Sequence, residues 1–268
     1  NTPAPSVDFD GTVYSGIDWT NLGTFTASNV TGFRTDVTAQ VAAKVGGGNA
    51  APFSFSVNSE TPNSSTDGEV LAIVYSNPAE AERTIAFLDG GTNAAGDSFS
   101  FLFANPLTMA QLSDPSFDAQ MSLGIGFSFR PSGQFSQIDV NGQRLTTDAG
   151  GQDDGIPTTI GNGGLITVGG IGDDPANPLD PFASNTNDPL VDDELYTLTS
   201  FLSPGDTNIL VETLNPSNDD NIFFAGFNIT ARGNVIIGPP TPIPSPAPLA
   251  LLAASLLGMG VIARRRKA

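Results

Sequence analysis

The sequence contains neither cysteine nor histidine. Without cysteine there is no disulfide framework, no thiolate metal site and no thiol nucleophile. Without histidine the Ser-His-Asp triad is excluded, and zinc and haem sites lose their ordinary ligands. A Ser–Lys dyad would have to use Lys44, which we expect at a strand end beside a loop. We therefore expect no enzymatic activity and no catalytic residues, with paired carboxylates of the glycoside-hydrolase kind as the remaining alternative.

Basic residues are also scarce. Ten Lys and Arg stand against 28 Asp and Glu, and four of the ten lie in the last five residues. The formal charge is −18 for the whole chain and −22 for residues 1–263. Such a field repels nucleic acid and anionic lipid, so no nucleic-acid binding is expected. It attracts cations such as Ca²⁺ where carboxylates converge, although simple solubility is an equal explanation.

Glycine and proline are abundant, with 51 of 268 residues between them. Short apolar runs separated by such turn residues are typical of many short strands. Residues 122–129 (SLGIGFSF) alternate, with Leu123 and Ile125 on one face, as a half-buried strand does. Residues 53–57 and 97–103 show the same alternation. Long helical periodicity is missing before residue 239, and short helices are expected only near residues 77–83 and 107–112.

Several segments predict particular strands. Residues 70–75 (VLAIVY) are apolar on both faces, which favours a central strand covered on both sides. Asn141-Gly142 lies between two strand-like runs and predicts a two-residue hairpin, because both turn positions need positive φ. Residues 194–202, 207–214 and 221–231 are further candidates. In the last of these, four apolar residues at every second position are expected to share one face: Phe223, Ala225, Phe227 and Ile229.

About a dozen strands at this spacing predict an all-β fold, namely a single β-sandwich of jelly-roll type covering residues 1–238. The chain begins with NTPAPS and no Met. This start is typical of a mature end left after removal of a secretory signal, so we expect export.

The C-terminal segment differs from the body. Residues 239–248 contain six prolines and predict a semi-rigid spacer. Residues 249–263 carry no charge, and as a helix they would span about 22 Å, short of the ~30 Å hydrocarbon core. Arginine snorkelling and local thinning can close that gap. The expected anchor residues are Leu249, Leu251, Leu252, Leu256, Leu257, Val261, Ile262, Arg264, Arg265 and Arg266.

The uncharged run followed by cations predicts a single transmembrane or sorting helix at residues 249–263. The basic residues 264–268 then stay in the cytoplasm by the positive-inside tendency, which places the acidic body in the periplasm or outside the cell. A C-terminal helix buried in the core is the alternative.

The order of proline motif, apolar run and arginine-rich end resembles the PEP-CTERM sorting signal of exported proteins of Gram-negative bacteria. Ile243, Pro244, Pro246 and Ala247 resemble the variant of the signal that reads Val-Pro-Leu-Pro-Ala, and Ser245 stands where a Glu would complete Pro-Glu-Pro. The resemblance covers only residues 243–268. It implies a membrane-embedded exosortase-type processing enzyme as partner, and an association with exopolysaccharide and the cell surface.

Carboxylates are concentrated in one part of the chain. Between Thr146 and Ala231 there are fourteen Asp or Glu and no basic residue. Asp- and Asn-rich loops supply the six to eight oxygen ligands that Ca²⁺ requires. We therefore expect a Ca²⁺ site, with a solvated acidic surface as the alternative. The candidate ligands are Asp153, Asp154, Asp192, Asp193, Glu194, Asn218, Asp219 and Asp220.

The single tryptophan, Trp19, lies near Tyr14 in the sequence. We interpret it as a packing residue of the core or of a sheet edge. A sugar-stacking platform is the alternative.

The expected function is structural or adhesive: an exported, non-catalytic protein of the cell envelope or extracellular matrix, held by its tail until it is sorted. One alternative is a single-pass accessory subunit that retains the tail and docks onto a larger membrane complex or filament. Another is a Ca²⁺-dependent carbohydrate-binding module.

Overall fold

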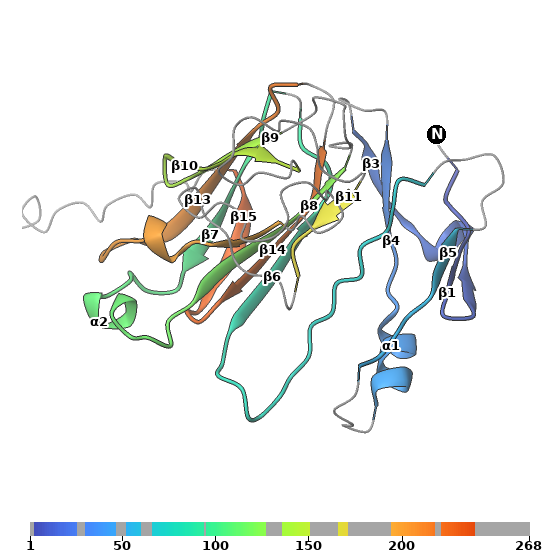
Figure 1. Ribbon diagram of the computed structural model, residues 1–268, viewed down its shortest axis with the longest axis horizontal. Coiled ribbons are helices and arrows are strands. Elements are labelled where there is room, and N and C mark those ends of the chain that lie inside the picture. The colour runs from blue at the N-terminus through green and yellow to red at the C-terminus, as the bar shows by residue number, and fades with distance from the viewer. Residues whose placement is uncertain are drawn as a thin grey trace, which may run out of the picture.

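The structure is a computed structural model that describes residues 3–25, 30–46, 52–59, 66–93, 95–126, 136–150, 166–170, 194–217 and 221–238. These residues are mostly strand, arranged in several antiparallel sheets with few and short helices, so the predicted all-β class is confirmed. Figure 1 shows the strands gathered into a large body, with a smaller N-terminal group beside it.

The large body is built from two five-stranded antiparallel sheets. The first has the order β10-β9-β13-β7-β15 and consists of β7 (Ser98–Phe103), β9 (Ser136–Val140), β10 (Gln143–Ala149), β13 (Asn208–Leu214) and β15 (Gly233–Ile237). The second has the order β11-β8-β14-β6, with β12 also paired to β8. It consists of β6 (Thr84–Asp89), β8 (Ala119–Gly126), β11 (Ile166–Val168), β12 (Leu195–Thr197) and β14 (Asn221–Ile229). The helix α2 (Met109–Leu112) and a 3₁₀ turn, η2 (Thr199–Phe201), lie in connections between these strands.

The two sheets pack face to face through one apolar core. On β8, the residues Ala119, Met121, Leu123 and Ile125 are fully buried, as the alternation in this segment predicts. Between the sheets, the ring centroid of Phe227 on β14 lies 6.0 Å from that of Phe99 and 5.6 Å from that of Phe101. Both of these residues are on β7. A sandwich-like arrangement follows, since each sheet turns one apolar face towards the other.

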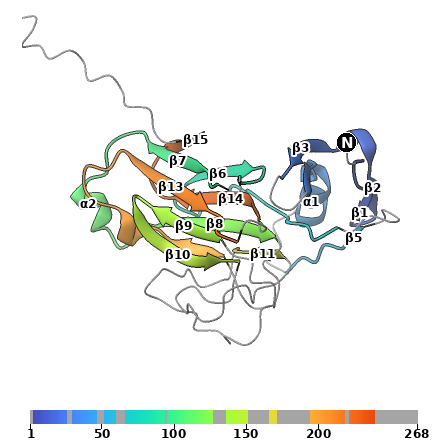
Figure 2. The same cartoon turned by 90° about the horizontal axis from the view of Figure 1, so that it is seen from above.

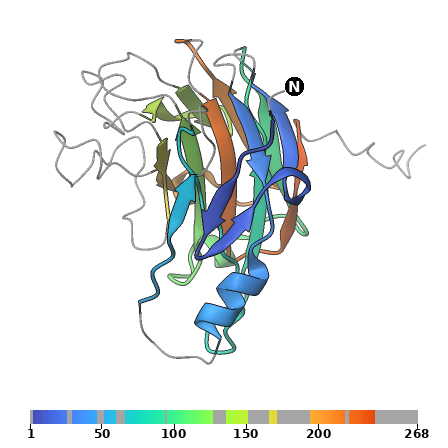
Figure 3. The same ribbon diagram turned by 90° about the vertical axis from the view of Figure 1, so that its right-hand side faces the viewer.

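The N-terminal residues form a smaller group, here called the lobe (residues 3–59). It contains a three-stranded sheet of order β2-β1-β5 and a two-stranded hairpin, β3–β4. Its strands are β1 (Val7–Phe9), β2 (Thr12–Tyr14), β3 (Thr20–Thr24), β4 (Thr31–Arg34) and β5 (Val57–Ser59), and its helices are the 3₁₀ turn η1 (Gly16–Asp18) and α1 (Thr38–Val45). Figures 1 and 2 show the lobe at one end of the body, and in Figure 1 the β3–β4 hairpin lies on the side of the lobe that faces the body. In Figure 3 the lobe lies in front of the sheets.

The hairpin predicted at Asn141-Gly142 is confirmed. β9 and β10 pair antiparallel across these two residues, whose φ angles are 50° and 74°. Positive φ at both positions is the conformation that a type I′ turn requires. Asn141 also ties the turn to the rest of the body, because its side-chain amide donates to the Phe201 carbonyl and accepts from the Leu210 amide.

Some predictions from local pattern are wrong. Residues 70–75 are not a central strand: the segment has no partner strand among the described residues, and residues 71–75 are exposed. An apolar run indicates burial but does not supply a partner edge, and here the segment connects the lobe to β6. Similarly, only Val57 of residues 53–57 belongs to a strand.

Two predictions about short segments are also wrong, and one is confirmed. Residues 77–83 form no helix. Residues 78–80 form a turn and a bend, and the side chain of Asn77 stabilises this turn by accepting a hydrogen bond from the amide of Ala79. Lys44 lies in the last turn of α1, not at a strand end, and its ammonium pairs with Asp10 at 2.6 Å. The short helix predicted near residues 107–112 is present as α2, with a capping box formed by Thr108 and Gln111.

One face assignment on β14 is also wrong. A β-bulge lies between Ile222 and Phe224, so the extra residue, Phe223, leaves the face that Ala225 and Phe227 share. Ile222 takes the inward position in its place and is 4% exposed. The sequence does not show which residue is the extra one, because Ile222, Phe223 and Phe224 are all apolar.

No helix within the described residues is long and apolar enough to cross a membrane. The predicted spacer, helix and basic tail at residues 239–268 lie outside the described residues.

The Asn141 contacts predict a measurable stability loss. We expect Asn141→Ala to lower the free energy of unfolding by about 2 kcal/mol, because it removes two hydrogen bonds and a residue that tolerates positive φ better than alanine does. Asn141→Asp keeps the acceptor for Leu210 and is expected to lose less. Urea unfolding of both variants checks this, with Asn234→Ala, an exposed asparagine of β15, as the control. Equal stability of Asn141→Ala and the original chain would contradict the assignment.

Candidate functional site

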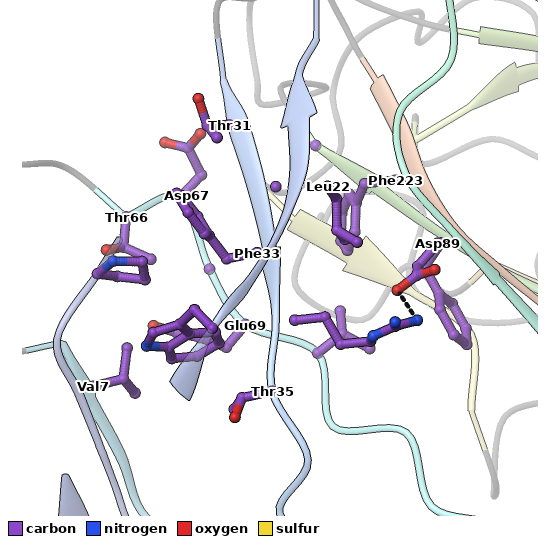
Figure 4. Close-up of a pocket in the computed structure, with 18 of the residues that line it drawn as sticks. Val7, Leu22, Thr31, Phe33, Thr35, Thr66, Asp67, Glu69, Asp89 and Phe223 are labelled. Atoms are coloured by element: carbon purple, nitrogen blue, oxygen red, sulfur yellow. Dashed lines mark hydrogen bonds and ion pairs between the residues drawn. The ribbon is translucent and has the colours of Figure 1, made fainter. Parts of the chain in front are cut away.

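A cavity of about 780 Å³ lies where the lobe meets the body. This volume is within the range of about 300–1,000 Å³ that is typical of ligand pockets. Its walls come from the β1-β5 sheet, the β3–β4 hairpin, residues 66–72 and the β6, β11 and β14 strands. In Figure 4 the hairpin crosses the middle of the cavity, with Asp67, Thr66 and Glu69 on one side and Leu22, Phe223 and Asp89 on the other.

The wall formed by the body is aromatic. We call Phe87, Phe223 and Phe224 the aromatic platform; all three line the cavity, and the rings of Phe87 and Phe224 lie 5.3 Å apart. Phe87 is 42% exposed, and the other two are half-buried. The rings extend over neighbouring glycines: a Cβ atom at Gly124 would come within 3.1 Å of Phe223, and one at Gly226 within 3.3 Å of Phe87. Glycine at these two positions leaves the rings room against the sheet.

The wall formed by the lobe is also rich in aromatic residues. Phe9, Tyr14, Trp19 and Phe33 line it. The indole N–H of Trp19 is buried and finds no acceptor among the described residues. A buried donor left without an acceptor costs about 1–3 kcal/mol, so this wall contains an unsatisfied polar group.

The β3–β4 hairpin is held against the body by packing more than by charge. The ring of Phe25 is 7% exposed and covers Gly91, where a Cβ atom would lie 1.9 Å from the ring. Arg34 pairs with Asp89 on β6 at 2.7 Å, but the Arg34 side chain is 60% exposed. An exposed pair of this kind contributes about 0–1 kcal/mol, so Phe25 is the stronger contact.

The cavity carries more negative than positive charge. Asp67, Glu69, Asp89 and Arg34 are the charged residues among its described lining. Arg34 is engaged by Asp89, and the ion pairs of the described residues include neither Asp67 nor Glu69. Partial burial raises the pKa of the Asp67 carboxyl above its ordinary value. Burial, followed by the nearby Asp36 and Asp18 carboxylates, raises the pKa of Tyr14.

Glu194 is the one predicted Ca²⁺ ligand that the structure describes. Its side chain is fully buried. One carboxylate oxygen accepts hydrogen bonds from the Gly150 amide at 2.7 Å and the Thr167 hydroxyl at 3.2 Å. The other accepts from the Tyr196 hydroxyl at 2.5 Å. These contacts join the end of β10 to β11 and β12, so within this network Glu194 acts as a structural acceptor.

The described residues contain no group of three or more Asp or Glu arranged to hold a metal ion. The other candidate Ca²⁺ ligands lie outside the described residues: Asp153, Asp154, Asp192, Asp193, Asn218, Asp219 and Asp220. The sorting-motif residues 243–247 and the anchor residues 249–266 lie outside them as well. The Ca²⁺ site therefore stays a prediction, as does the sorting signal.

Sequence reasoning missed the cavity as a whole. Of its lining, only Trp19 and Tyr14 were considered together, as packing residues or as a sugar-stacking platform. The available signal was the doubled aromatic pair in NIFFAGF, residues 221–227, which is one apolar residue too many for strict alternation. Asp67 and Glu69 gave no signal, because nothing in the sequence brings residues 66–72 next to the lobe.

Comparison with protein-family models, with curated proteins and with solved structures finds no match to this chain. The site is therefore interpreted from its own geometry.

The Glu194 network predicts a large stability effect. We expect Glu194→Ala to lower the free energy of unfolding by about 3 kcal/mol, because it leaves buried donors on Tyr196, Thr167 and Gly150 without this acceptor. Glu194→Gln keeps one acceptor oxygen and is expected to lose less. Urea unfolding measures both, and Glu212→Ala on the exposed face of β13 is the matched control. A loss no greater than that of the control would show that the network is not structural.

The raised pKa of Asp67 predicts a pH-dependent effect. The folded state disfavours the charged carboxylate, so this group reduces stability at neutral pH, and the penalty disappears once pH falls below its ordinary value of 3.8. We expect Asp67→Asn to raise the thermal unfolding midpoint at pH 7 and to have no effect below about pH 3.5. Glu69→Gln is the comparison variant, because it removes one negative charge at a more exposed position. A gain for Asp67→Asn that persists at low pH would exclude titration of Asp67 as the cause.

Proposed function

We propose that this chain is an exported, non-catalytic adhesive or structural protein of the cell surface or extracellular matrix. The observation that carries the proposal is the order of segments. An acidic all-β body is followed by a proline-rich spacer, an uncharged run at residues 249–263 and four cations in the last five residues. In this proposal the run anchors the body to the inner membrane until an exosortase-type enzyme acts on the motif at residues 243–247.

We further propose that the body is a jelly roll. The strand orders support this: β11-β8-β14-β6 faces β10-β9-β13-β7, and β15 extends the β10-β9-β13-β7 sheet beside β7. Between β6 and β14 the chain passes back and forth between the sheets, so that two Greek keys are wound together.

A carbohydrate-binding module is the second candidate function. Two observations favour it: aromatic side chains line the cavity, and lectin domains are among the proteins built as jelly rolls. Dependence on Ca²⁺ would come from the acidic loops, and a chelator would then weaken any binding.

The anchoring proposal predicts the mass and topology of the native protein. Protease added outside intact cells is expected to digest the body, since the basic tail keeps only residues 264–268 in the cytoplasm. Protection of the body would overturn the topology. As a control, replacing Arg264, Arg265 and Arg266 by Glu removes the charge asymmetry and is expected to abolish the orientation.

The intact mass of the native protein shows whether the C-terminal tail is removed or retained. A mass that ends within residues 244–248 supports sorting and release, and one that includes residues 249–268 supports a permanently anchored subunit. Either mass is compatible with surface exposure, whereas a protein found in the cytoplasm with its tail intact would contradict export.

A further inference from the structure

We propose that the cavity between lobe and body binds a neutral polysaccharide chain, whose sugar rings stack on the aromatic platform of Phe87, Phe223 and Phe224. The proposal rests on the proposed function, because a protein of the cell surface or matrix meets such polymers there. It names the ligand class that the adhesive function would use.

The platform provides the stacking surface. Three aromatic rings gather on the outer face of the β6-β14-β8 part of the sheet, and two glycines give them room to lie along it. The β-bulge at Phe223 is what places two consecutive phenylalanines of β14 on the cavity side. The negative face of an aromatic ring attracts the polarised C–H groups that one face of a sugar ring presents. Phe87 remains accessible for such a contact, since it is 42% exposed with the lobe in place.

The polar groups of the cavity distinguish a sugar from a lipid. Asp67 and Glu69 bring carboxylate acceptors to the lining of the cavity, and in Figure 4 they lie across the β3–β4 hairpin from Phe223. Trp19 adds an N–H donor that finds no acceptor among the described residues. An alkyl chain would leave these groups without partners and would pay their desolvation. Hydroxyl groups both donate and accept, so a sugar can bond to the carboxylates and, after a small shift of the indole, to Trp19.

The charge of the cavity favours a neutral polymer. Its described lining has three carboxylates and one guanidinium, and that guanidinium is paired with Asp89. The whole chain carries a formal charge of −18. An anionic polysaccharide would meet repulsion from the chain as a whole and find no unpaired cation in the described lining.

A peptide is the competing ligand. Peptides that bind to sheets pair with the free main-chain groups of an edge strand. The platform residues Phe223 and Phe224 instead belong to β14, which is paired on both sides by β6 and β8. At Phe223 and Phe224 the cavity therefore offers side-chain faces of the sheet, which suit stacked rings better than an added strand.

The single tryptophan makes the binding site directly observable. Trp19 lines the cavity, and no other tryptophan contributes to fluorescence. A ligand that enters the cavity changes the surroundings of this indole, whereas a ligand bound elsewhere on the body leaves its emission unchanged.

The test first applies the full chain to an array of neutral glycans. Each glycan that binds is then titrated as a soluble hexasaccharide, and binding is measured by Trp19 emission and by calorimetry. We expect at least one neutral hexasaccharide to bind and shift the emission, and hexagalacturonate to do neither. Phe87→Ala and Asp67→Asn are each expected to weaken binding at least tenfold. Tyr75→Ala is the matched control, because Tyr75 is an exposed aromatic residue outside the lining and should leave affinity unchanged.

Several results would overturn the proposal. These are an array with no positive neutral glycan, binding without a change in Trp19 emission, or equal affinity of Phe87→Ala and the original chain. Binding of a β-strand-forming peptide in the cavity, with no glycan able to compete, would assign the site to peptides. The glycan array uses purified protein, so an array without a positive glycan does not contradict the outward orientation that the proposed function requires. Conversely, protection of the body from protease would overturn that orientation but would not contradict glycan binding.

Discussion

The nine residues of β14 hold the molecule together, because both faces of this strand are used. On the inner face, Phe227 packs against Phe99 and Phe101 of the opposite sheet, and truncating a ring buried in this way typically costs about 3–5 kcal/mol. On the outer face, Phe224 lies against Phe87 in the cavity wall. Core and candidate site are thus built on one backbone, and a change in its register would disturb both.

The β-bulge between Ile222 and Phe224 allows β14 to supply apolar residues to the core and aromatic residues to the cavity wall. A strand in regular alternation that begins with Ile222 inward would send Phe224 into the core, and Ala225 and Phe227 outward. One extra residue resets the alternation, so that Ile222, Ala225 and Phe227 all enter the core. The lobe then packs across the aromatic face that results, with Phe25 seated on Gly91.

The sequence alone predicts the all-β class, the Asn141-Gly142 turn and the buried face of β8, since these depend on local alternation and on positive φ. It fails for residues 70–75, whose apolar run resembles a central strand but has no partner among the described residues. The cavity could not be predicted either, because it joins segments as distant as Trp19, Asp67 and Phe224, which share no local pattern. The predicted Ca²⁺ ligands mostly lie outside the described residues, and Glu194 is engaged by donors of three different segments.

The position of β15 has a mechanical consequence. It is an edge strand, paired only with β7 among the described residues, and its end at Gly238 is fastened by a hydrogen bond from its amide to Ser98 and one from the Ser100 hydroxyl to its carbonyl. Tension applied between the lobe and the residues after Gly238 would reach the body through these two bonds and the β7–β15 ladder. Resistance to pulling is set by the rate at which the first element detaches, not by the free energy of the whole fold. If the chain bears load in the proposed adhesive role, the two hydrogen bonds of Gly238 would then matter more than any contact of the core, and the Ser100 hydroxyl makes one of them.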